Sequence, residues 1–438
     1  MFKRTLLQSA ALLSLFVLGT MTIEMLTESA PLNFQNRWKT FAALKAEAAG
    51  TIYVDASASG AGTGLNWTDA YPKLQDALAA AASGDQIWVA AGVYYPDQGV
   101  GMIDNDRTMT FTLINGVVLY GGFAGGETIV SQRDWVENST ILSGDIDQND
   151  LSGENAFHVL SGGGTDSSAV LDGFTVTAGR ANGSISSQKE GAGMVNIASS
   201  PTLSNLIFTS NLAEYYGGGM YNINSSPMLT NVRFSGNQSD SSGGGVRNSN
   251  GNPVLVNTLF SGNKSMIGGG MYNDSSNPTL TNVTFSGNLA LFGSGGGMYN
   301  TSSSPTLINT ILWNNHAGSS GDQIFNSSST PFISFSDIQD GGGSSSWDTG
   351  LGTDGGNNID DNPFFVTPVD PTTAPTTSGD LHLQFGSPAV DAGYNDLCPV
   401  TDLDGYKRPI DGDLDGSAIC DMGAYEKLID LFLPLIMR

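Results

Sequence analysis

A unit of about 26 residues is written six times between Gly191 and Ile338. Two clear copies read GGGMYNDSSNPTLTNVTFSGN from Gly268 and GGGMYNTSSSPTLINTILWNN from Gly295. The starts of successive copies are 26, 26, 25, 27 and 26 residues apart. A fixed period of this size is typical of a solenoid, in which each unit stacks on the next one. We therefore expect this part of the chain to fold as a stack of similar coils.

The same residue types recur in fixed columns when the copies are aligned. Each copy alone has too little apolar surface to fold, but stacked apolar columns form a continuous core. Asparagine suits turns because it tolerates left-handed backbone, and a stacked asparagine can bond the amide of the next one. The apolar columns begin at Met194, Leu203 and Phe208, and the asparagine columns begin at Asn196, Asn205 and Asn211.

The apolar pieces of each copy are short and have polar neighbours, so they predict strands and not helices. Coils built from two or three short strands stack at the strand spacing of about 4.8 Å. The chirality rule for parallel crossovers makes the coiling right-handed. Leucine-rich repeats are the alternative solenoid, but they need more leucines and a helical segment in each copy. The sequence therefore predicts an all-β fold, a right-handed single-stranded parallel β-helix, over 191–338.

The segment before the regular copies, 50–190, predicts a cap and degenerate coils. Lys73 to Ala82 is rich in Ala and Leu and predicts a short N-terminal capping helix, which would cover the open end of the core. This helix, followed by GDQIWVAAGVYY, resembles the start of pectin-lyase-like β-helix proteins. The stretches GVVLYGGFAGGET, SQRDWVENSTILSGDID and VLDGFTVTAGRA resemble a broad bacterial group of secreted right-handed β-helix proteins.

The 26-residue repeat is no longer recognisable in the sequence after Ile338. The stretch 339–378 is rich in Gly, Ser, Thr and Pro and predicts a loop or linker. The segment 379–427 contains GSPAVDAG and DMGAYE, and it resembles the choice-of-anchor Q domain found at the end of bacterial surface proteins. This resemblance implies an architecture and a cell-surface setting, and it assigns no activity.

The two ends of the chain bear on its location. The N-terminus reads MFKRTLLQSAALLSLFVLG, which is typical of a secretory signal peptide, with an uncleaved signal-anchor as the alternative. We assign 1–49 to this leader. The apolar tail, 428–438, is too short to span a bilayer and is either a sorting tail or a last strand. We expect a secreted or cell-surface protein with no transmembrane span in the mature chain.

Composition and cysteine content narrow the partners and the compartment. The 438 residues carry a formal net charge of −25. This acidity argues against nucleic acid and anionic membranes as partners, because both need a basic patch. The two cysteines, Cys398 and Cys420, are 22 residues apart, about one coil. In a secreted protein this pair predicts a disulfide, and two free thiols are the alternative.

Acidic residues between the two cysteines form a candidate metal site. The order Asp411-x-Asp413-x-Asp415-Gly copies the first half of a Ca²⁺ loop, with hard oxygen ligands at alternate positions. Met422 stands where such a loop needs a bidentate Glu, so another carboxylate, Asp421 or Glu426, would have to substitute. A solvated acidic turn is the alternative interpretation.

One column of the repeat points outward and is rich in aromatic residues. It lies between the Met column and the first Asn column, and strand alternation places it on the outer surface. Such a stripe can stack against sugar rings, although aromatic residues also favour strands and stack on each other. The candidate ligand-binding residues of this stripe are Tyr221, Arg247, Tyr272, Tyr299 and Phe325.

Charged residues are sparse in the repeat, and no clear catalytic constellation is visible. A glycosidase needs two carboxylates at a defined separation; Glu214 and Asp240 are one coil apart but occupy variable turns. We therefore interpret the protein as an adhesion or recognition protein, with polysaccharide as its expected partner and without catalysis. A polysaccharide lyase or glycoside hydrolase is one alternative, supported by fold analogy alone. A passive cell-envelope spacer is the other.

Overall fold

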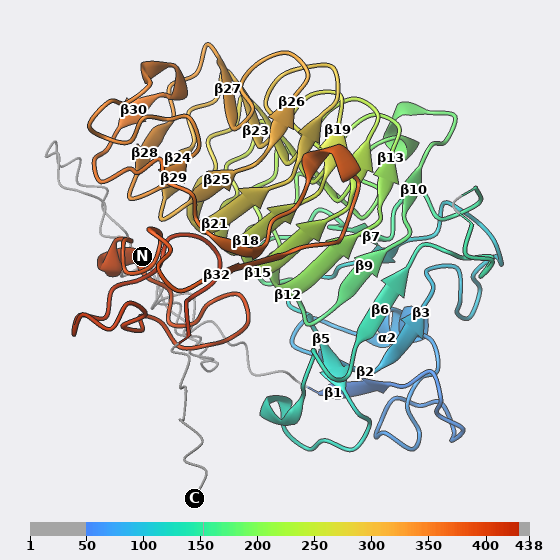
Figure 1. Cartoon of the computed structure of the whole chain (residues 1–438). Helices are drawn as coiled ribbons and strands as arrows, with labels where there is room; N and C mark the ends of the chain where they lie inside the picture. Colours follow the sequence, from blue (N-terminus) through green and yellow to red (C-terminus); the bar gives the residue numbers. More distant parts are fainter. Residues whose placement is uncertain (1–49, 152, 429–438) are drawn as a thin grey trace, which may run out of the picture. The chain divides into compact units, whose positions relative to one another are not determined.

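The computed structural model describes residues 50–151 and 153–428. Short parallel strands stack coil upon coil into three sheets, which we call sheets A, B and C (Figure 1). This arrangement confirms the expected right-handed parallel β-helix. Within the described residues no helix is long and apolar enough to cross a membrane. The leader, 1–49, and most of the apolar tail lie outside the described residues.

Sheet A is the largest of the three. Its main path is β1 (Thr51–Val54), β2 (Gln86–Ala90), β5 (Val118–Phe123), β8 (Val170–Asp172), β12 (Thr202–Thr209), β15 (Met228–Ser235), β18 (Val254–Ser261), β21 (Thr279–Ser286), β24 (Thr306–Ile308), β28 (Phe332–Ser334) and β30 (Thr353–Asp354). Beside this path lie β3 (Gly92–Tyr94), β6 (Thr140–Ser143), β9 (Thr175–Thr177), β25 (Ile311–Trp313) and β29 (Asp337–Ile338).

Sheets B and C complete each coil. Sheet B contains β4 (Phe111–Thr112), β7 (Leu160–Ser161), β11 (Met194–Ile197), β14 (Met220–Ile223), β17 (Val246–Ser249), β20 (Met271–Asp274), β23 (Met298–Thr301) and β27 (Ile324–Ser327). Sheet C contains β10 (Arg180–Ala181), β13 (Leu212–Ala213), β16 (Gln238–Ser239), β19 (Lys264–Ser265), β22 (Leu289–Ala290) and β26 (His316–Ala317). The strands before β11 pair in parallel with those of the regular copies, β7 with β11 and β8 with β12.

Asparagines form the corners and bond from coil to coil. Asn231 bends β15 at a φ of 56°, a left-handed conformation that asparagine adopts at lower cost than most residues. Within sheet B, Asn222 donates its side-chain amide to the side-chain oxygen of Asn248 at 2.8 Å, and Asn248 repeats this contact with Asn273 at 2.8 Å. The expected asparagine ladder is therefore confirmed.

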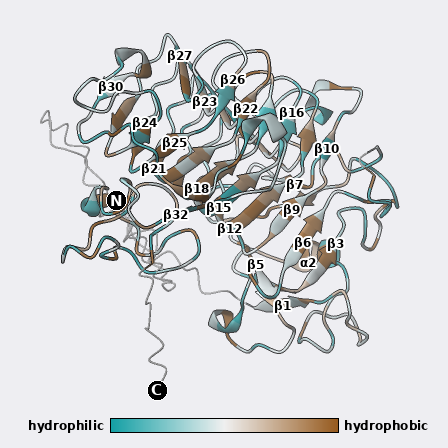
Figure 2. Cartoon of the chain, in the orientation of Figure 1, coloured by the Kyte–Doolittle hydropathy of each residue, from teal (hydrophilic) through white to brown (hydrophobic). Residues whose placement is uncertain are grey.

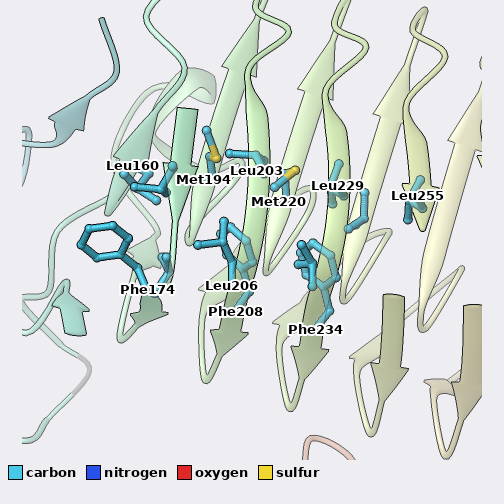
Figure 3. Close-up of a cluster of buried hydrophobic side chains, with 14 of the residues drawn as sticks. Leu160, Phe174, Met194, Leu203, Leu206, Phe208, Met220, Leu229, Phe234 and Leu255 are labelled. Carbon is cyan, nitrogen blue, oxygen red and sulfur yellow. The ribbon is translucent and has the colours of Figure 1, made fainter. Parts of the chain in front are cut away.

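The apolar columns meet inside the coils and form one continuous core (Figures 2 and 3). Side chains of the Met, Leu and Phe columns are buried, and Figure 3 shows Met194 of β11 beside Leu203 of β12, with Phe208 farther along β12 next to Leu206. The rings of Phe208 and Phe234 stack with centroids 4.9 Å apart. The expected capping helix is α2 (Leu74–Ala80), which buries Leu74, Ala77 and Leu78 at the first coils.

The solenoid extends past the last regular copy. Within 339–378, β30 pairs with β28, and Ile359 forms a parallel bridge with Asp337. This stretch, which the sequence assigns to a loop or linker, therefore also carries an irregular further coil. Two antiparallel strands follow, β31 (Phe365–Thr367) and β32 (Asp380–Leu383). From there the chain runs back across the outer face of sheet A (Figure 1).

Candidate functional site

An outward column of sheet A runs in register across successive coils. Its side chains point away from the core, because the buried residues of the same strands alternate with them. Ile207, on β12, is 38% exposed, whereas Leu259, on β18, is only 5% exposed. One half of the column is thus open and the other is covered. The column consists of Val93, Ile141, Thr175, Ile207, Arg233, Leu259, Thr284, Ile311 and Asp337.

The cover over the second half is the C-terminal segment, which we define as 379–427. Leu259 and Ile311 of the column join an apolar cluster with residues of this segment, including Leu403. The corner asparagines hold its backbone: Asn282 donates its amide to the carbonyl of Gly423 at 3.1 Å, and Asn309 bonds the backbone of Tyr394. The segment is therefore an integral part of the β-helix surface.

The open half of the column forms the floor of a groove of about 330 Å³. This volume lies in the range of small-molecule binding sites. One wall comes from the loop before β6 and the opposite wall from the C-terminal segment. The lining residues are Trp135, Val136, Ser139, Thr140, Gly173, Phe174, Thr175, Asn205, Leu206, Ile207, Asn231, Arg233, Leu403 and Asp404.

Trp135 supplies an exposed ring at the first wall. Its side chain is 40% exposed, and the guanidinium of Arg133 lies 4.8 Å from its ring centroid. Arg133 also forms an ion pair with Asp172 at 2.8 Å and bonds the carbonyl oxygen of Gly121. Arg133 is therefore neutralised by Asp172 inside the protein, and its guanidinium packs against the indole ring of Trp135.

The opposite wall is a network of charged side chains. Arg233 pairs with Asp404 and also bonds the hydroxyl of Tyr425. His382 lies between two carboxylates, with Nε2 2.6 Å from Asp404 Oδ2 and Nδ1 2.5 Å from Asp380 Oδ1. The hydrogen bond to Asp404 raises the pKa of His382. Burial lowers this pKa, and the hydrogen bond to Asp380 raises it further. This network fixes the positions of Arg233 and Asp404 in the groove.

Asp404 is the one carboxylate among the residues that line the groove. Burial by itself would raise its pKa, but the hydrogen bond from His382 and the charge of Arg233 outweigh burial and hold the pKa below its usual value. A carboxyl group that stays ionised cannot serve as a general acid at neutral pH. The groove thus offers an aromatic ring, a paired guanidinium and the amides of Asn205 and Asn231, which also bond each other at 3.1 Å.

The aromatic stripe predicted from the repeat lies on the outer face of sheet B. The register places Tyr221, Arg247, Tyr272, Tyr299 and Phe325 side by side on successive coils. Tyr272 and Tyr299 stack at 4.9 Å, Tyr299 and Phe325 at 5.0 Å, and Arg247 lies 4.7 Å from the ring of Tyr272. The ring faces of Tyr272 and Tyr299 are therefore occupied by neighbours. Ligand binding by this stripe stays a prediction, with ring edges as the available surface.

The acidic residues between the cysteines form a different group from the predicted one. Asp391, Asp411 and Asp413 place one carboxylate oxygen each within 4.8 Å of one another. Asp415 is not part of this group, and its carboxylate accepts the backbone N–H of Ser417 instead. The sequence missed Asp391 because it lies 20 residues before Asp411 in the chain. A Ca²⁺ site here stays a prediction.

Asp421 and Glu426, which the sequence offered as further metal ligands, serve a buried ion network. Arg408 and Glu426 are fully buried, with Arg408 Nε 3.1 Å from Glu426 Oε2. Asp421 accepts the backbone N–H of Asp391 at 2.8 Å. The predicted disulfide between Cys398 and Cys420 is formed and closes the same region. These contacts link several parts of the C-terminal segment to one another next to the groove.

Comparison with known proteins gives distant structural similarity. No family model and no curated protein matches the chain, so the resemblance of 379–427 to the choice-of-anchor Q domain is not supported. The structure is similar to that of pectate lyase Pel9A, at 13% identity and a TM-score of 0.47, covering 89% of this chain and 99% of that chain. A rhamnogalacturonan lyase has 13% identity and a TM-score of 0.30, covering 66% and 68%. Similarity at this level does not determine an activity.

Proposed function

We propose that this chain is a secreted or cell-surface β-helix protein that binds polysaccharide in the groove on sheet A and does not cleave it. The observation that carries the proposal is the exposed ring of Trp135 beside a polar row of Asn205, Asn231 and Arg233 in one groove. Sugar rings have apolar faces and a rim of hydroxyl groups. An indole ring can cover such a face, while amides and a guanidinium bond the hydroxyl groups.

The charges of the groove favour a neutral glycan. An acidic glycan needs cationic groups that are free to pair with its carboxylates. Arg233, which lines the groove, is paired with Asp404, and Arg133 behind Trp135 is paired with Asp172. The chain as a whole carries a formal charge of −25, which repels an anionic polymer at long range.

The same groups support binding over catalysis. Hydrolysis of a glycosidic bond uses two carboxylates that flank it, one of them protonated. Asp404 is the single carboxylate in the lining, and its pKa is lowered by its hydrogen bond to His382 and its pairing with Arg233, against the effect of burial. Arg233 bonds both Asp404 and Tyr425, so it is a poor base for proton abstraction. Lyase or hydrolase activity and a passive spacer role are the alternatives that an experiment must separate.

The test is a combined retention and cleavage screen of the mature chain. The neutral probes are hydroxyethylcellulose, arabinoxylan, galactomannan and laminarin, and the acidic probes are polygalacturonate and alginate. Affinity gel electrophoresis measures retention, and a reducing-end assay, run with calcium and with chelator, measures cleavage. We expect retention by at least one neutral polymer and no new ends. New ends would make the protein an enzyme, and no retention by any polymer, from folded protein, would favour the spacer.

A further inference from the structure

The groove is closed at the end where the C-terminal segment begins. Arg233 is the last half-exposed member of the outward column, and the next members, Leu259 and Thr284, are 5% and 1% exposed. Leu403 and Asp404 stand over this boundary and line the groove. A glycan lying along the column cannot continue past Arg233, because the path is filled by protein.

The loop that carries Trp135 flanks the groove. A side chain at Gly122 would lie 2.8 Å from the backbone nitrogen of Trp135, and one at Gly173 would lie 3.3 Å from its Cβ. The loop that carries Trp135 therefore rests directly on the corner of these two coils. From Arg233 the column runs back to Ile141 over three coil spacings, or about 14 Å, and beyond Ile141 it continues to Val93, which is 41% exposed, so the groove is open at this end. This length holds a short oligosaccharide.

The wall at Arg233 is held from several directions. Asn257 donates its amide to the carbonyl oxygen of Thr401 at 2.6 Å, and the N–H of Leu403 bonds the carbonyl of Ala424 at 3.0 Å. Leu403 is buried in the apolar cluster over the covered half of sheet A. Moving the wall aside would expose this cluster and break these hydrogen bonds, so a ligand meets it as a fixed surface.

We infer that the groove takes the end of a neutral glycan chain and does not take its interior. This inference rests on the proposed function and specifies the part of the polymer that is recognised. The terminal sugars lie on Thr175 and Ile207 against the ring of Trp135. The last sugar meets Arg233 and Asp404, which both line the groove, and the rest of the chain leaves toward solvent.

The test compares one polymer before and after it is cut. Whichever of hydroxyethylcellulose, arabinoxylan, galactomannan and laminarin is retained is partly hydrolysed with acid, and the concentration of chain ends is measured in both samples. The full mature chain is titrated with each sample by calorimetry. If ends are bound, shortening the chains tenfold strengthens binding about tenfold per gram and leaves the Kd per end unchanged, since mass action counts binding sites.

The outcomes separate the inference from the proposed function. An equal Kd per gram before and after hydrolysis means that chain interiors are bound, which overturns end recognition and leaves the polysaccharide-binding function standing. Absence of binding to both samples overturns the function and the inference together. Trp135→Ala provides the site control, because loss of binding to both samples assigns the signal to the groove. The matched variant Phe292→Ala, at an exposed ring outside the groove lining, is expected to bind both samples as wild type.

Discussion

Arg233 and Asp404 lie 171 residues apart in the chain, and their side chains form an ion pair at the end of the groove. Arg233 belongs to β15 of the regular repeat, whereas Asp404 belongs to the C-terminal segment. Both side chains are partly exposed, at 28% and 25%, so the pair contributes little to stability. The pair instead fixes where the two side chains lie, because it joins the repeat and the C-terminal segment at the proposed binding surface.

The first prediction concerns this pair. Asp404→Asn keeps the shape of the side chain but removes the charge that orients Arg233 and His382. We expect the unfolding free energy to fall by about 1 kcal/mol or less, and glycan affinity to fall about tenfold, which equals 1.4 kcal/mol. Urea denaturation and calorimetry measure the two quantities. Unchanged affinity in a folded variant would show that the pair does not form part of the binding surface.

The second prediction concerns the pH dependence of stability. Asp337 is fully buried in the covered half of the outward column, and burial raises its pKa to about 8, against a weak hydrogen bond from the N–H of Asp361. Because the pKa of Asp337 is higher in the folded than in the unfolded protein, its neutral carboxyl group stabilises the fold relative to the ionised form. This contribution to the unfolding free energy is fully present below the unfolded pKa near 3.8 and is lost as pH rises toward 8. The variant Asp337→Asn has a neutral side chain at this position at every pH. Its unfolding free energy at pH 8 should therefore exceed that of the wild type by about 1–3 kcal/mol.

The measurement is urea denaturation of both proteins at several pH values from 5 to 8. The wild type should lose stability over this range while Asp337→Asn loses less, so the difference between the two grows with pH. Parallel curves for the two proteins would mean that Asp337 is ionised in the folded state throughout.

The third prediction concerns the buried ion network of the C-terminal segment. Arg408→Met leaves Glu426 buried without its cationic partner. Removing one member of a buried ion pair costs about 3–5 kcal/mol, because the remaining charge is desolvated and uncompensated. Lys407→Met is the matched control at the neighbouring exposed position and should change stability little. Equal stability of the two variants in urea would contradict a structural role for Arg408.

The fourth prediction concerns calcium. If the carboxylates of Asp391, Asp411 and Asp413 hold Ca²⁺, millimolar calcium raises the Tm of the chelated protein. Asp411→Asn should abolish this rise, whereas Asp240→Asn, outside the group, should keep it. A Tm that is the same in calcium and in chelator would identify the group as a solvated acidic turn.

The regular coils could be predicted from the sequence because each column repeats one residue type. Phe208, Phe234 and Phe260 occupy the same position in three copies, and the structure stacks them. The asparagine columns could be predicted for the same reason, because the same residue recurs at one position of each copy. Identical residues at a fixed spacing have the same environment in every coil, so one copy describes the others.

The groove could not be predicted in this way. Thr175, Ile207, Arg233 and Leu259 form one spatial column, but they share no chemical property that would mark it. Trp135 lies in a degenerate coil, and Asp404 comes from a segment without any period. The register that brings these residues together is set by backbone pairing, and the C-terminal segment is placed by side-chain contacts far apart in the sequence. Asn205 and Asn231 of the groove do belong to a repeated column, but that repetition marks a corner of every coil and does not single out the groove.

The most direct test of the central claim is the affinity of Trp135→Ala for the neutral polysaccharide that the wild type binds, measured beside the double variant Tyr272→Ala/Tyr299→Ala. The account predicts that Trp135→Ala loses binding at least tenfold, about 1.4 kcal/mol, while the double variant on sheet B binds as wild type. Retained binding by Trp135→Ala together with loss in the double variant would contradict the account and place the glycan on the aromatic stripe.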